Sequence, residues 1–413
     1  MKKCVLGDYI LDMASGPFGS NLKVECFVPS GFPIIDGANL YGVRVTDNVT
    51  KFVTEEKARS LSRSIAKRHD VIVTISGTLG QVAYIPSDSL YEEYLCSQRQ
   101  FRVTFDESKI DVEYLVNLLH TDYGQKKILS FANYVGVPAL SQPLPNFRRI
   151  ELELPDIEKQ HKVAKIISTI DRKIALNRKR IATLEAMAKE IYDYWFVQFD
   201  FPDAHGRPYK SSGGAMVYNP DLKREIPKGW EVGDFTDLID FTMGQSPAGS
   251  TLNDAGDGVL FYQGATDFGL YFPSPRQFTN NPVRMARAGD VLLSVRAPVG
   301  TLNFASDDCC VGRGLGAFRG KETSNLFVWF YLRSLKPYFD SKNVAGTTFG
   351  SIGKDDFKML KTIIPAKPTL CAYNEVSENI YKQMLLCNCE MSYDGKLRDF
   401  LLPLLMNGQV KVG

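Results

Sequence analysis

The chain has 413 residues, of which 44% are hydrophobic and 23% charged, and its formal net charge is +2. This composition indicates a globular protein of two or three domains, and it excludes a mainly disordered chain and a uniformly basic nucleic-acid coat. The eight cysteines lack zinc-finger spacing, and no apolar run reaches the ~18 residues that span a bilayer, so we expect a cytoplasmic protein with free thiols and no membrane contact.

The first part of the chain predicts alternating strands and helices. Thr54 is a suitable N-cap for a helix over residues 55–67. This helix and the residue after it carry cations that face either phosphates or solvent: Lys57, Arg59, Arg63, Lys67 and Arg68. Apolar runs rich in Val and Ile predict strands at Val71–Ser76, Gln81–Ile85 and Arg148–Leu154. An apolar stretch over residues 112–124 predicts a further helix.

After Pro155, the sequence predicts one long helix that Asp156 caps. Apolar residues recur with alternating spacings of four and three, which is the 3.5-residue period of a coiled-coil seam. The seam consists of Val163, Ile167, Ile170, Ile174, Asn177, Ile181, Leu184, Ala188, Ile191 and Trp195. The polar Asn177 could fix the register of a partner helix. At ~1.5 Å per residue the seam spans roughly 50 Å, more than the ~34 Å turn of B-DNA, so this helix could be a spacer between two DNA-contacting domains.

The second part of the chain begins with residues 201–228, which are rich in Pro, Gly and Ser and predict an exposed linker. Strands are predicted at Val291–Val295 and Lys361–Ile364, and a helix over residues 325–339. A second long helix is predicted from about Asn374 to Leu405 as the partner of the first. Its seam is poorer, is interrupted by Gly395, and consists of Val376, Ile380, Met384, Cys387 and Met391.

The two parts repeat each other. "DVIVTISGTLG" at residues 70–80 matches "DVLLSVRAPVG" at residues 290–300, and "IIDGANL" at 34–40 matches "FYQGATD" at 261–267. "NYVGVPALS" at 133–141 matches "NVAGTTFGS" at 343–351, where Gly136 corresponds to Gly346. Several weak matches in the same order indicate a duplication. We therefore predict an α+β fold with two pseudo-repeated α/β units separated by an antiparallel coiled coil of the two long helices.

Recognition of DNA requires Arg, Lys, Asn, Gln or Ser on loops that can enter a groove. Residues 15–23 and 76–81 form such loops in the first unit, and residues 243–250 and 296–300 in the second. The candidate DNA-binding residues are Ser20, Asn21, Lys23, Ser76, Thr78, Gln81 and Arg99 in the first unit, and Gln245, Ser246, Arg276, Arg284, Arg287, Arg296, Arg313 and Arg319 in the second. The glycines of these loops could equally serve tight turns alone.

The sequence shows no convincing catalytic motif. The NPPY-like motif of an adenine methyltransferase is missing, and the glycines of residues 312–316 precede no convincing helix. Asp156, Asp171 and Lys173 match the loose PD…DxK pattern of metal-dependent nucleases, but the last two lie on the predicted long helix and not on a strand. We therefore expect no catalytic, metal-binding or cofactor-binding residue, with a metal-dependent nuclease as an alternative.

Residues 154–200, "LPDIEKQHKVAKIISTIDRKIALNRKRIATLEAMAKEIYDYWFVQFD", and the C-terminal "LRDFLLPLLMNGQV" resemble the specificity (S) subunit of Type I restriction-modification systems. The resemblance implies a non-catalytic, DNA-binding protein of phage defence. It implies a target-recognition domain at 1–155, a central conserved helix at 156–200, a linker at 201–228, a second target-recognition domain at 229–367 and a C-terminal conserved helix at 368–413.

The resemblance also implies partners. Each target-recognition domain would contact one half of an asymmetric, bipartite site in double-stranded DNA, and the helices would bind two adenine methyltransferase (M) subunits, which restriction (R) subunits join. S-adenosylmethionine would belong to the M subunit, and ATP with magnesium to the R subunit, so this chain would itself bind no cofactor. A stand-alone DNA-binding protein of similar architecture is a further alternative.

Overall fold

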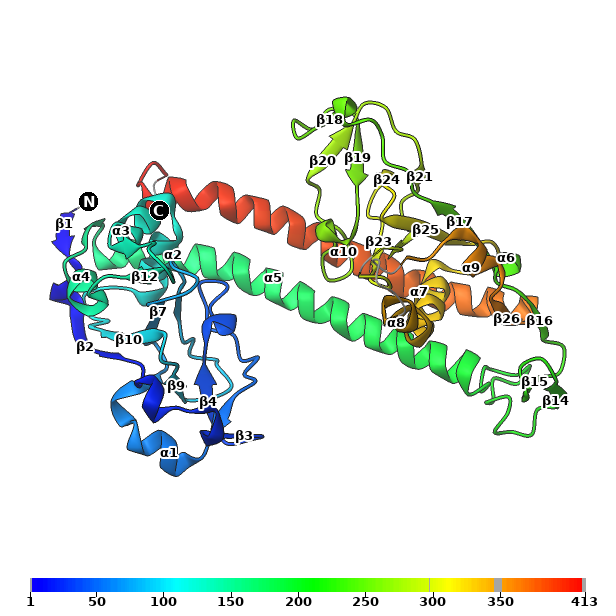
Figure 1. Cartoon of the computed structure of the whole chain (residues 1–413), viewed down its shortest axis with the longest axis horizontal. Coiled ribbons are helices and arrows are strands. Elements are labelled where there is room, and N and C mark those ends of the chain that lie inside the picture. The colour runs from blue at the N-terminus through cyan, green and yellow to red at the C-terminus, as the bar shows by residue number, and fades with distance from the viewer. Residues whose placement is uncertain (1, 297, 345–350, 411–413) are drawn as a thin grey trace. The chain divides into compact units, whose positions relative to one another are not determined.

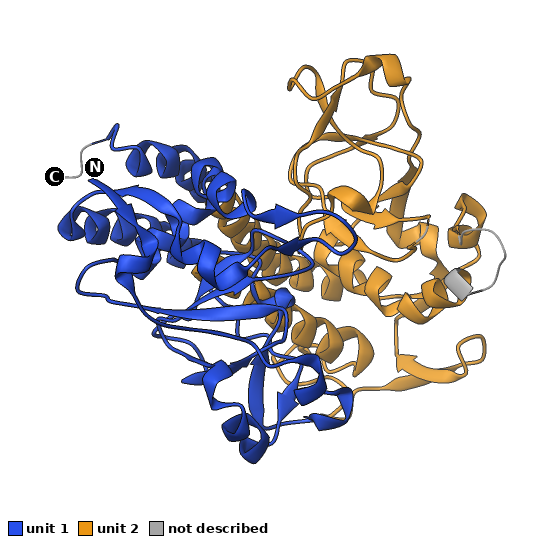
Figure 2. Ribbon diagram, turned by 60° about the vertical axis from the view of Figure 1, so that its left-hand side comes forward, with its two compact units in different colours: residues 1–174, 393–413 blue, residues 175–392 orange. Residues whose placement is uncertain are grey.

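The computed structural model describes residues 2–296, 298–344 and 351–410. The chain divides into two compact units, which Figure 2 distinguishes by colour: unit 1 comprises residues 1–174 and 393–413, and unit 2 comprises residues 175–392. The predicted domain boundaries follow the sequence repeats instead of these units and stay a prediction. Within the described ranges, no helix is both long and apolar enough to cross a membrane.

Unit 1 contains two principal sheets. The four-stranded antiparallel sheet has the order β2 (Ile10–Ser15), β10 (Gln100–Phe105), β7 (Val71–Thr74), β8 (Val82–Tyr84). The five-stranded sheet has the order β3 (Phe27–Val28), β5 (Phe52–Val53), β4 (Phe32–Ile35), β9 (Glu93–Cys96), β6 (Ile65–Lys67), and β4 and β9 are parallel. Two further pairs are β1 (Lys2–Val5) with β13 (Glu151–Leu154), and β11 (Ala132–Asn133) with β12 (Ala139–Leu140).

Unit 2 has the same sheet topology. Its four-stranded sheet has the order β17 (Ile239–Met243), β25 (Leu315–Gly320), β22 (Val291–Ser294), β23 (Leu302–Phe304). Its five-stranded sheet has the order β18 (Leu252–Asn253), β20 (Gln277–Thr279), β19 (Val259–Tyr262), β24 (Cys309–Val311), β21 (Met285–Ala286), with β19 and β24 parallel. β16 (Glu231–Asp234) pairs with β26 (Lys361–Ile364). The shared strand order, including the parallel pair, confirms the duplicated α+β organisation.

The matched sequences occupy matched positions. Asp70 and Asp290 precede β7 and β22, and each is buried. The backbone N–H of Lys67 donates to Asp70 Oδ2 at 2.9 Å, and the backbone N–H of Arg287 donates to Asp290 Oδ2 at 2.8 Å. The same aspartate therefore closes the same turn in both units. The predicted match of Gly136 with Gly346 lies partly outside the described residues, because Gly346 does.

The short helices differ in part from the predictions. In unit 1 they are α1 (Glu55–Ser60), α2 (Val112–His120), α3 (Asp122–Leu129) and α4 (Pro143–Arg148); in unit 2 they are α6 (Phe235–Leu238), α7 (Asn325–Ser334), α8 (Lys336–Val344) and α9 (Lys354–Lys358). The helix predicted over residues 55–67 ends at Ser60, because residues 65–67 pair with β9 instead. The helix predicted over residues 112–124 breaks at Thr121, whose hydroxyl accepts the Gly124 N–H and caps α3.

The predicted linker, residues 201–228, is more ordered than expected. It contains a hairpin of β14 (Met216–Asn219) and β15 (Arg224–Pro227). The ring of Phe201 stacks on the rings of Tyr209 and Trp230, with centroids 4.6 and 5.0 Å apart. Aromatic packing therefore fastens this segment to unit 2 although its composition resembles that of a flexible connector.

Two long helices, α5 (Ile157–Tyr192) and α10 (Lys367–Met406), dominate Figure 1. In unit 1 the first part of α5 packs with the last part of α10: Val163 and Ile167 share a core with Leu405 and Met406. Arg398 Nη1 lies 3.0 Å from Asp171 Oδ1. The backbone N–H of Lys159 donates to Asp156 Oδ1 at 3.0 Å, so Asp156 caps α5.

In unit 2 the second part of α5 packs with the first part of α10. Asn177 Nδ2 donates to Glu390 Oε2 at 2.8 Å. Directly after α5, in the π-helical turn Asp193–Val197, the ring of Trp195 lies 5.7 Å from the ring of Tyr373 on α10. Early residues of one helix thus meet late residues of the other within each unit, which is the antiparallel pairing expected. The seam positions Val163, Ile167, Asn177, Ile181, Ala188 and Trp195 are buried, and Ile170, Ile174, Leu184 and Ile191 are partly buried.

The prediction for the second long helix was wrong in three respects. α10 begins at Lys367, seven residues before Asn374, and it continues through Gly395 without interruption. Val376, assigned to its seam, is 40% exposed, whereas Met384 and Cys387 are buried. A glycine inside a helix costs about 1 kcal/mol, which the packing of the surrounding turns against α5 can outweigh.

Candidate nucleic-acid interface

A cavity of about 620 Å³ opens in unit 1 beside the turns that follow β7 and precede β10. Four predicted residues line it: Ser76, Thr78, Gln81 and Arg99. The predicted Ser20, Asn21 and Lys23 are exposed but do not line it, whereas their neighbours Leu22 and Val24 do. The sheet therefore gathers one of the two predicted loops at the cavity and leaves the polar residues of the other outside the lining.

Polar contacts link several of the residues that line this cavity. The hydroxyl of the buried Thr74 donates to Gln81 Oε1 at 3.0 Å, and Gln81 Nε2 donates to the carbonyl of Gly37 at 3.0 Å. Lys51 Nζ lies 2.7 Å from Asp36 Oδ2. Both ends of the Gln81 amide are thus engaged within the unit. Gln81 holds two segments of the cavity together and is less available to a ligand than its sequence position suggests.

In contrast to Gln81, Arg99 has side-chain donors that are available to a ligand. Its side chain is exposed, and among the described residues its guanidinium has no hydrogen-bond or ion-pair partner. The turn opposite it contains Gly77, whose φ of +96° favours glycine, and a Cβ added there would lie 3.7 Å from Arg99 Nη1. An unpartnered guanidinium at a cavity rim can donate two parallel hydrogen bonds to a guanine edge or to a phosphate.

Unit 2 presents a different set of side chains at the corresponding turns. The hydroxyl of Ser246 donates to Gln263 Oε1 at 2.9 Å and accepts the backbone N–H of Arg313 at 3.3 Å. Arg313, Arg296 and Gln245 are exposed. The Ser246 hydroxyl therefore links the segments that contain Gln263 and Arg313. The guanidinium groups of Arg296 and Arg313 are donors without a partner among the described residues.

The other predicted arginines of unit 2 separate into two groups. Arg276 Nε donates to Asp267 Oδ1 at 2.8 Å, and Arg319 Nε donates to Asp290 Oδ1 at 2.6 Å. These two guanidinium groups neutralise buried carboxylates. Arg284 and Arg287 are exposed, and in the part of the chain that the structure describes their guanidinium groups have no hydrogen-bond or ion-pair partner, although the charge of Arg287 acts on Asp290.

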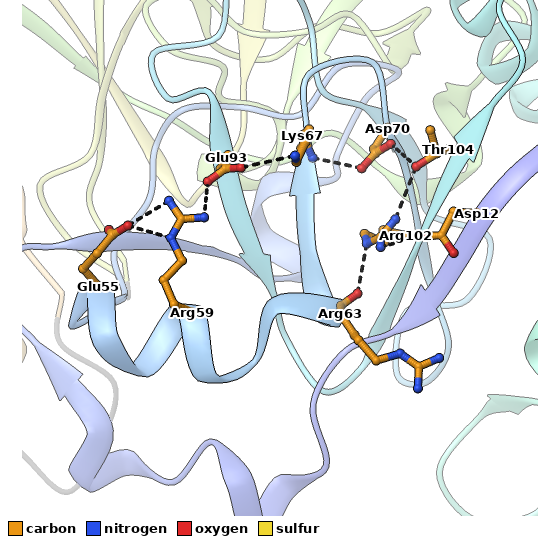
Figure 3. A network of polar contacts seen from close by, with 9 residues as sticks. All are labelled: Asp12, Glu55, Arg59, Arg63, Lys67, Asp70, Glu93, Arg102 and Thr104. Atoms are coloured by element: carbon orange, nitrogen blue, oxygen red, sulfur yellow. Dashed lines mark hydrogen bonds and ion pairs between the residues drawn. The ribbon is translucent and has the colours of Figure 1, made fainter.

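Three of the five predicted cations around α1 are ion-paired: Arg59 and Lys67, which Figure 3 shows, and Arg68, whose Nη1 lies 3.7 Å from Glu92 Oε1. Arg59 bonds to Glu55 at 2.8 Å and to Glu93 at 2.6 Å, and Lys67 lies 3.6 Å from Glu93. The hydrogen bond to Glu93 is the main reason why the pKa of Arg59 is raised. Acidic neighbours thus cancel much of the positive field of this segment, which weakens the hypothesis that it faces phosphates.

Buried acids and thiols of the two units have structural roles. Burial raises the pKa of Asp70, against the hydrogen bonds from Thr104 and the Lys67 backbone; burial also raises the pKa of Asp290, against the bonds from the Arg287 backbone and from Arg319. Burial raises the pKa of the thiols of Cys96 and Cys309 to about 12. Such thiols stay protonated and unreactive at neutral pH.

The residues that match the nuclease pattern, Asp156, Asp171 and Lys173, do not lie together at one site. Asp156 caps the start of α5, whereas Asp171 lies fifteen residues further along the same helix, about 22 Å away at ~1.5 Å per residue. Asp171 pairs with Arg398, and Lys173 Nζ lies 3.0 Å from Asp394 Oδ2. The two carboxylates are too far apart to bind one metal ion. Within the described residues, no group of three His, Cys, Asp or Glu side chains could hold a metal ion.

Comparison with known proteins finds a matching family model and similar chains. The family model described as the Type I restriction modification DNA specificity domain matches residues 28–186 and 227–370. A Methanocaldococcus jannaschii protein assigned as the specificity subunit of the type I restriction enzyme MjaX is 30% identical over 311 residues, which cover 74% of this chain and 70% of that protein. The MjaIX specificity subunit of the same organism is 22% identical over 374 residues, or 87% and 82% of the two chains.

The architecture also has a solved counterpart. The crystal structure of a Type I restriction-modification S subunit from M. genitalium aligns with a TM-score of 0.62 over 98% of this chain and 95% of that one, at 14% identity. At this identity the likeness concerns the fold.

Proposed function

The chain belongs to the family of Type I restriction-modification DNA specificity subunits, and from this premise we propose that it selects a bipartite, asymmetric site in double-stranded DNA and catalyses no reaction itself. Unit 1 would contact one half of the site and unit 2 the other. The observation that carries the proposal is that two units, whose main sheets share one strand order, present different free donors at corresponding turns.

Strand register defines which residues correspond. Thr74 pairs with Gln100 in unit 1, and Ser294 pairs with Leu315 in unit 2. Counting from these pairs, Ser76 corresponds to Arg296, Gln98 to Arg313, and Arg99 to Gly314. One scaffold thus presents a serine, a glutamine and an arginine in unit 1, but two arginines and a glycine in unit 2. Because hydrogen-bond donors at base edges determine sequence preference, the two half-sites should differ.

The long helices are the proposed binding surface for two methyltransferase subunits, which restriction subunits would join. Large apolar side chains are exposed along both helices: Leu176 and Met187 on α5, and Leu386 and Phe400 on α10. Exposed apolar surface of this kind is typical of protein interfaces. S-adenosylmethionine would be bound by the methyltransferase subunit, and ATP with magnesium by the restriction subunit, so the specificity chain needs no cofactor.

The proposal is tested with the purified full chain and a pool of randomised DNA duplexes. Repeated selection should yield two short conserved segments separated by a gap of constant length. After addition of the methyltransferase subunit and S-adenosylmethionine, adenine methylation should occur at the selected site and at no other. Selection of a single uninterrupted segment, or of no sequence, would contradict the proposal.

A further inference from the structure

The hairpin formed by β11 and β12 in unit 1 has an apolar tip. Tyr134, Val135 and Val137 are 65%, 88% and 68% exposed. Scattered apolar residues are normal on a protein surface, but these three lie within four positions of one tip, and no described residue of unit 1 covers them. We therefore expect a partner from outside the unit to cover this patch.

The tip is held in one conformation. The Asn133 side chain accepts the backbone N–H of Val135 at 2.9 Å, and Gly136 has a φ of +77°, which favours glycine. The backbone N–H of Gly77 donates to the carbonyl of Pro138 at 2.9 Å, and the backbone N–H of Leu140 donates to the carbonyl of Ile75 at 2.8 Å. The loss of conformational entropy on binding is therefore small, as in a preorganised recognition element.

These hydrogen bonds attach the hairpin to the rim of the cavity. Residues 75–77 form the turn to which the hairpin is bonded, and Ser76 and Gly77 line the cavity with Arg99. A ligand that reaches the free guanidinium of Arg99 thus lies next to the tip. An arginine that binds guanine O6 and N7 acts in the major groove, where the one apolar group on a base edge is the C5-methyl group of thymine.

Resting on the proposed function, we propose that the tip of the β11–β12 hairpin enters the major groove and contacts thymine methyl groups in the half-site of unit 1. Continuity with the cavity rim favours DNA over a protein partner. A protein interface would be expected to continue on the apolar surface of the long helices, whereas the tip is bonded to a turn lined by polar groups.

The test uses duplexes of the selected sequence in which uracil replaces thymine, position by position, so that only the methyl group is lost. Burial of one such group contributes about 0.8 kcal/mol, which corresponds to about fourfold in affinity. For the unmodified chain, uracil at one or two positions of a single half-site should weaken binding about fourfold each. In the Tyr134→Ser, Val135→Ser, Val137→Ser variant, which removes the whole patch, thymine and uracil duplexes should bind equally. Leu90→Ser, which also removes an exposed apolar side chain but does not line the cavity, should retain the difference.

The outcomes separate the two proposals. If the unmodified chain selects no DNA sequence, the proposed function fails. If it selects one and the uracil effect is absent, or persists undiminished in the variant, the inference about the hairpin is wrong. Loss of co-purification with the methyltransferase subunit, with unchanged DNA affinity, would instead assign the tip to a protein interface and overturn the inference.

Discussion

Arg99 and Arg313 provide a sharp test of separate recognition by the two units. Each side chain is exposed, and neither guanidinium bonds to any residue that the structure describes. Removal of either guanidinium therefore breaks no interaction with a described residue. We expect Arg99→Gln and Arg313→Gln to leave stability nearly unchanged, within about 0.5 kcal/mol, as for surface substitutions away from structural features.

The expected effect on binding is larger. An arginine that bonds to a guanine edge contributes about 1–3 kcal/mol, so its replacement should weaken binding of the selected duplex by about fivefold to 150-fold. The loss should be confined to one base pair. With Arg99→Gln the preference should relax at a position in one half-site, and with Arg313→Gln at a position in the other.

Fluorescence anisotropy with the selected duplex and all single-base variants, repeated at several salt concentrations, measures both effects. Lys109→Gln is the matched control, since it removes the same charge from a side chain that lies 2.7 Å from Asp106. If Arg99→Gln weakened every duplex equally and reduced the salt dependence, Arg99 would contact a phosphate. If either substitution relaxed both half-sites, the separate assignment of the units would be refuted.

Three further predictions concern stability and chemistry. Asn177→Leu should lower the free energy of unfolding by about 1 kcal/mol, because Glu390 loses its amide donor, and a thermal melt would measure this. The double variant Asn177→Leu, Glu390→Leu should recover most of the lost stability. Because burial raises the pKa of Asp70 above its ordinary 3.8, the folded chain binds this proton more readily than the unfolded chain, and the contribution of Asp70 to stability falls as pH rises above 3.8. In a pH series of unfolding midpoints, Asp70→Asn should therefore gain stability relative to the unmodified chain between pH 4 and pH 7. With magnesium alone, both the unmodified chain and Asp171→Ala should leave a plasmid uncut in a gel assay. Asp171→Ala should lower the unfolding midpoint in a melting curve, because Arg398 loses its ion-pair partner.

Much of the fold could be predicted from the sequence because it depends on periodicity and on local motifs. The apolar period from Val163 to Trp195 defined α5, and Pro155 with Asp156 marked its start. The matched strands around Asp70 and Asp290 revealed the duplication. The predictions were wrong where contacts with residues distant in sequence decide where a helix begins, ends or continues. Gly395 indicates a break by propensity, but it lies within a continuous helix whose neighbouring Asp394 is buried.

The candidate site was less predictable, because charge alone does not distinguish a free side chain from a paired one. Arg99 and Arg319 look equivalent in the sequence, yet Arg319 Nε lies 2.6 Å from Asp290 Oδ1, whereas the guanidinium of Arg99 bonds to none of the described residues. Gln98, which lines the cavity, was missed because it belongs to no glycine-rich loop. The repeat itself could have found it: Arg313 was a candidate, and register relates it to Gln98.

That register relation explains how one scaffold can serve two different half-sites. Asp70 and Asp290 accept the same backbone bond and close the same turn, so the positions of the neighbouring rim residues are set by groups common to both units. The guanidinium groups of Arg99, at the cavity rim in unit 1, and of Arg313, at the corresponding turn of unit 2, bond to no described residue and therefore carry no part of the fold. Substitution at the rim should change which bases are preferred at little cost in stability, whereas substitution of either aspartate should change stability and leave the base preference intact. If Asp290→Asn changed the base preference, the residues that close the turn and the residues that contact the bases would not act independently.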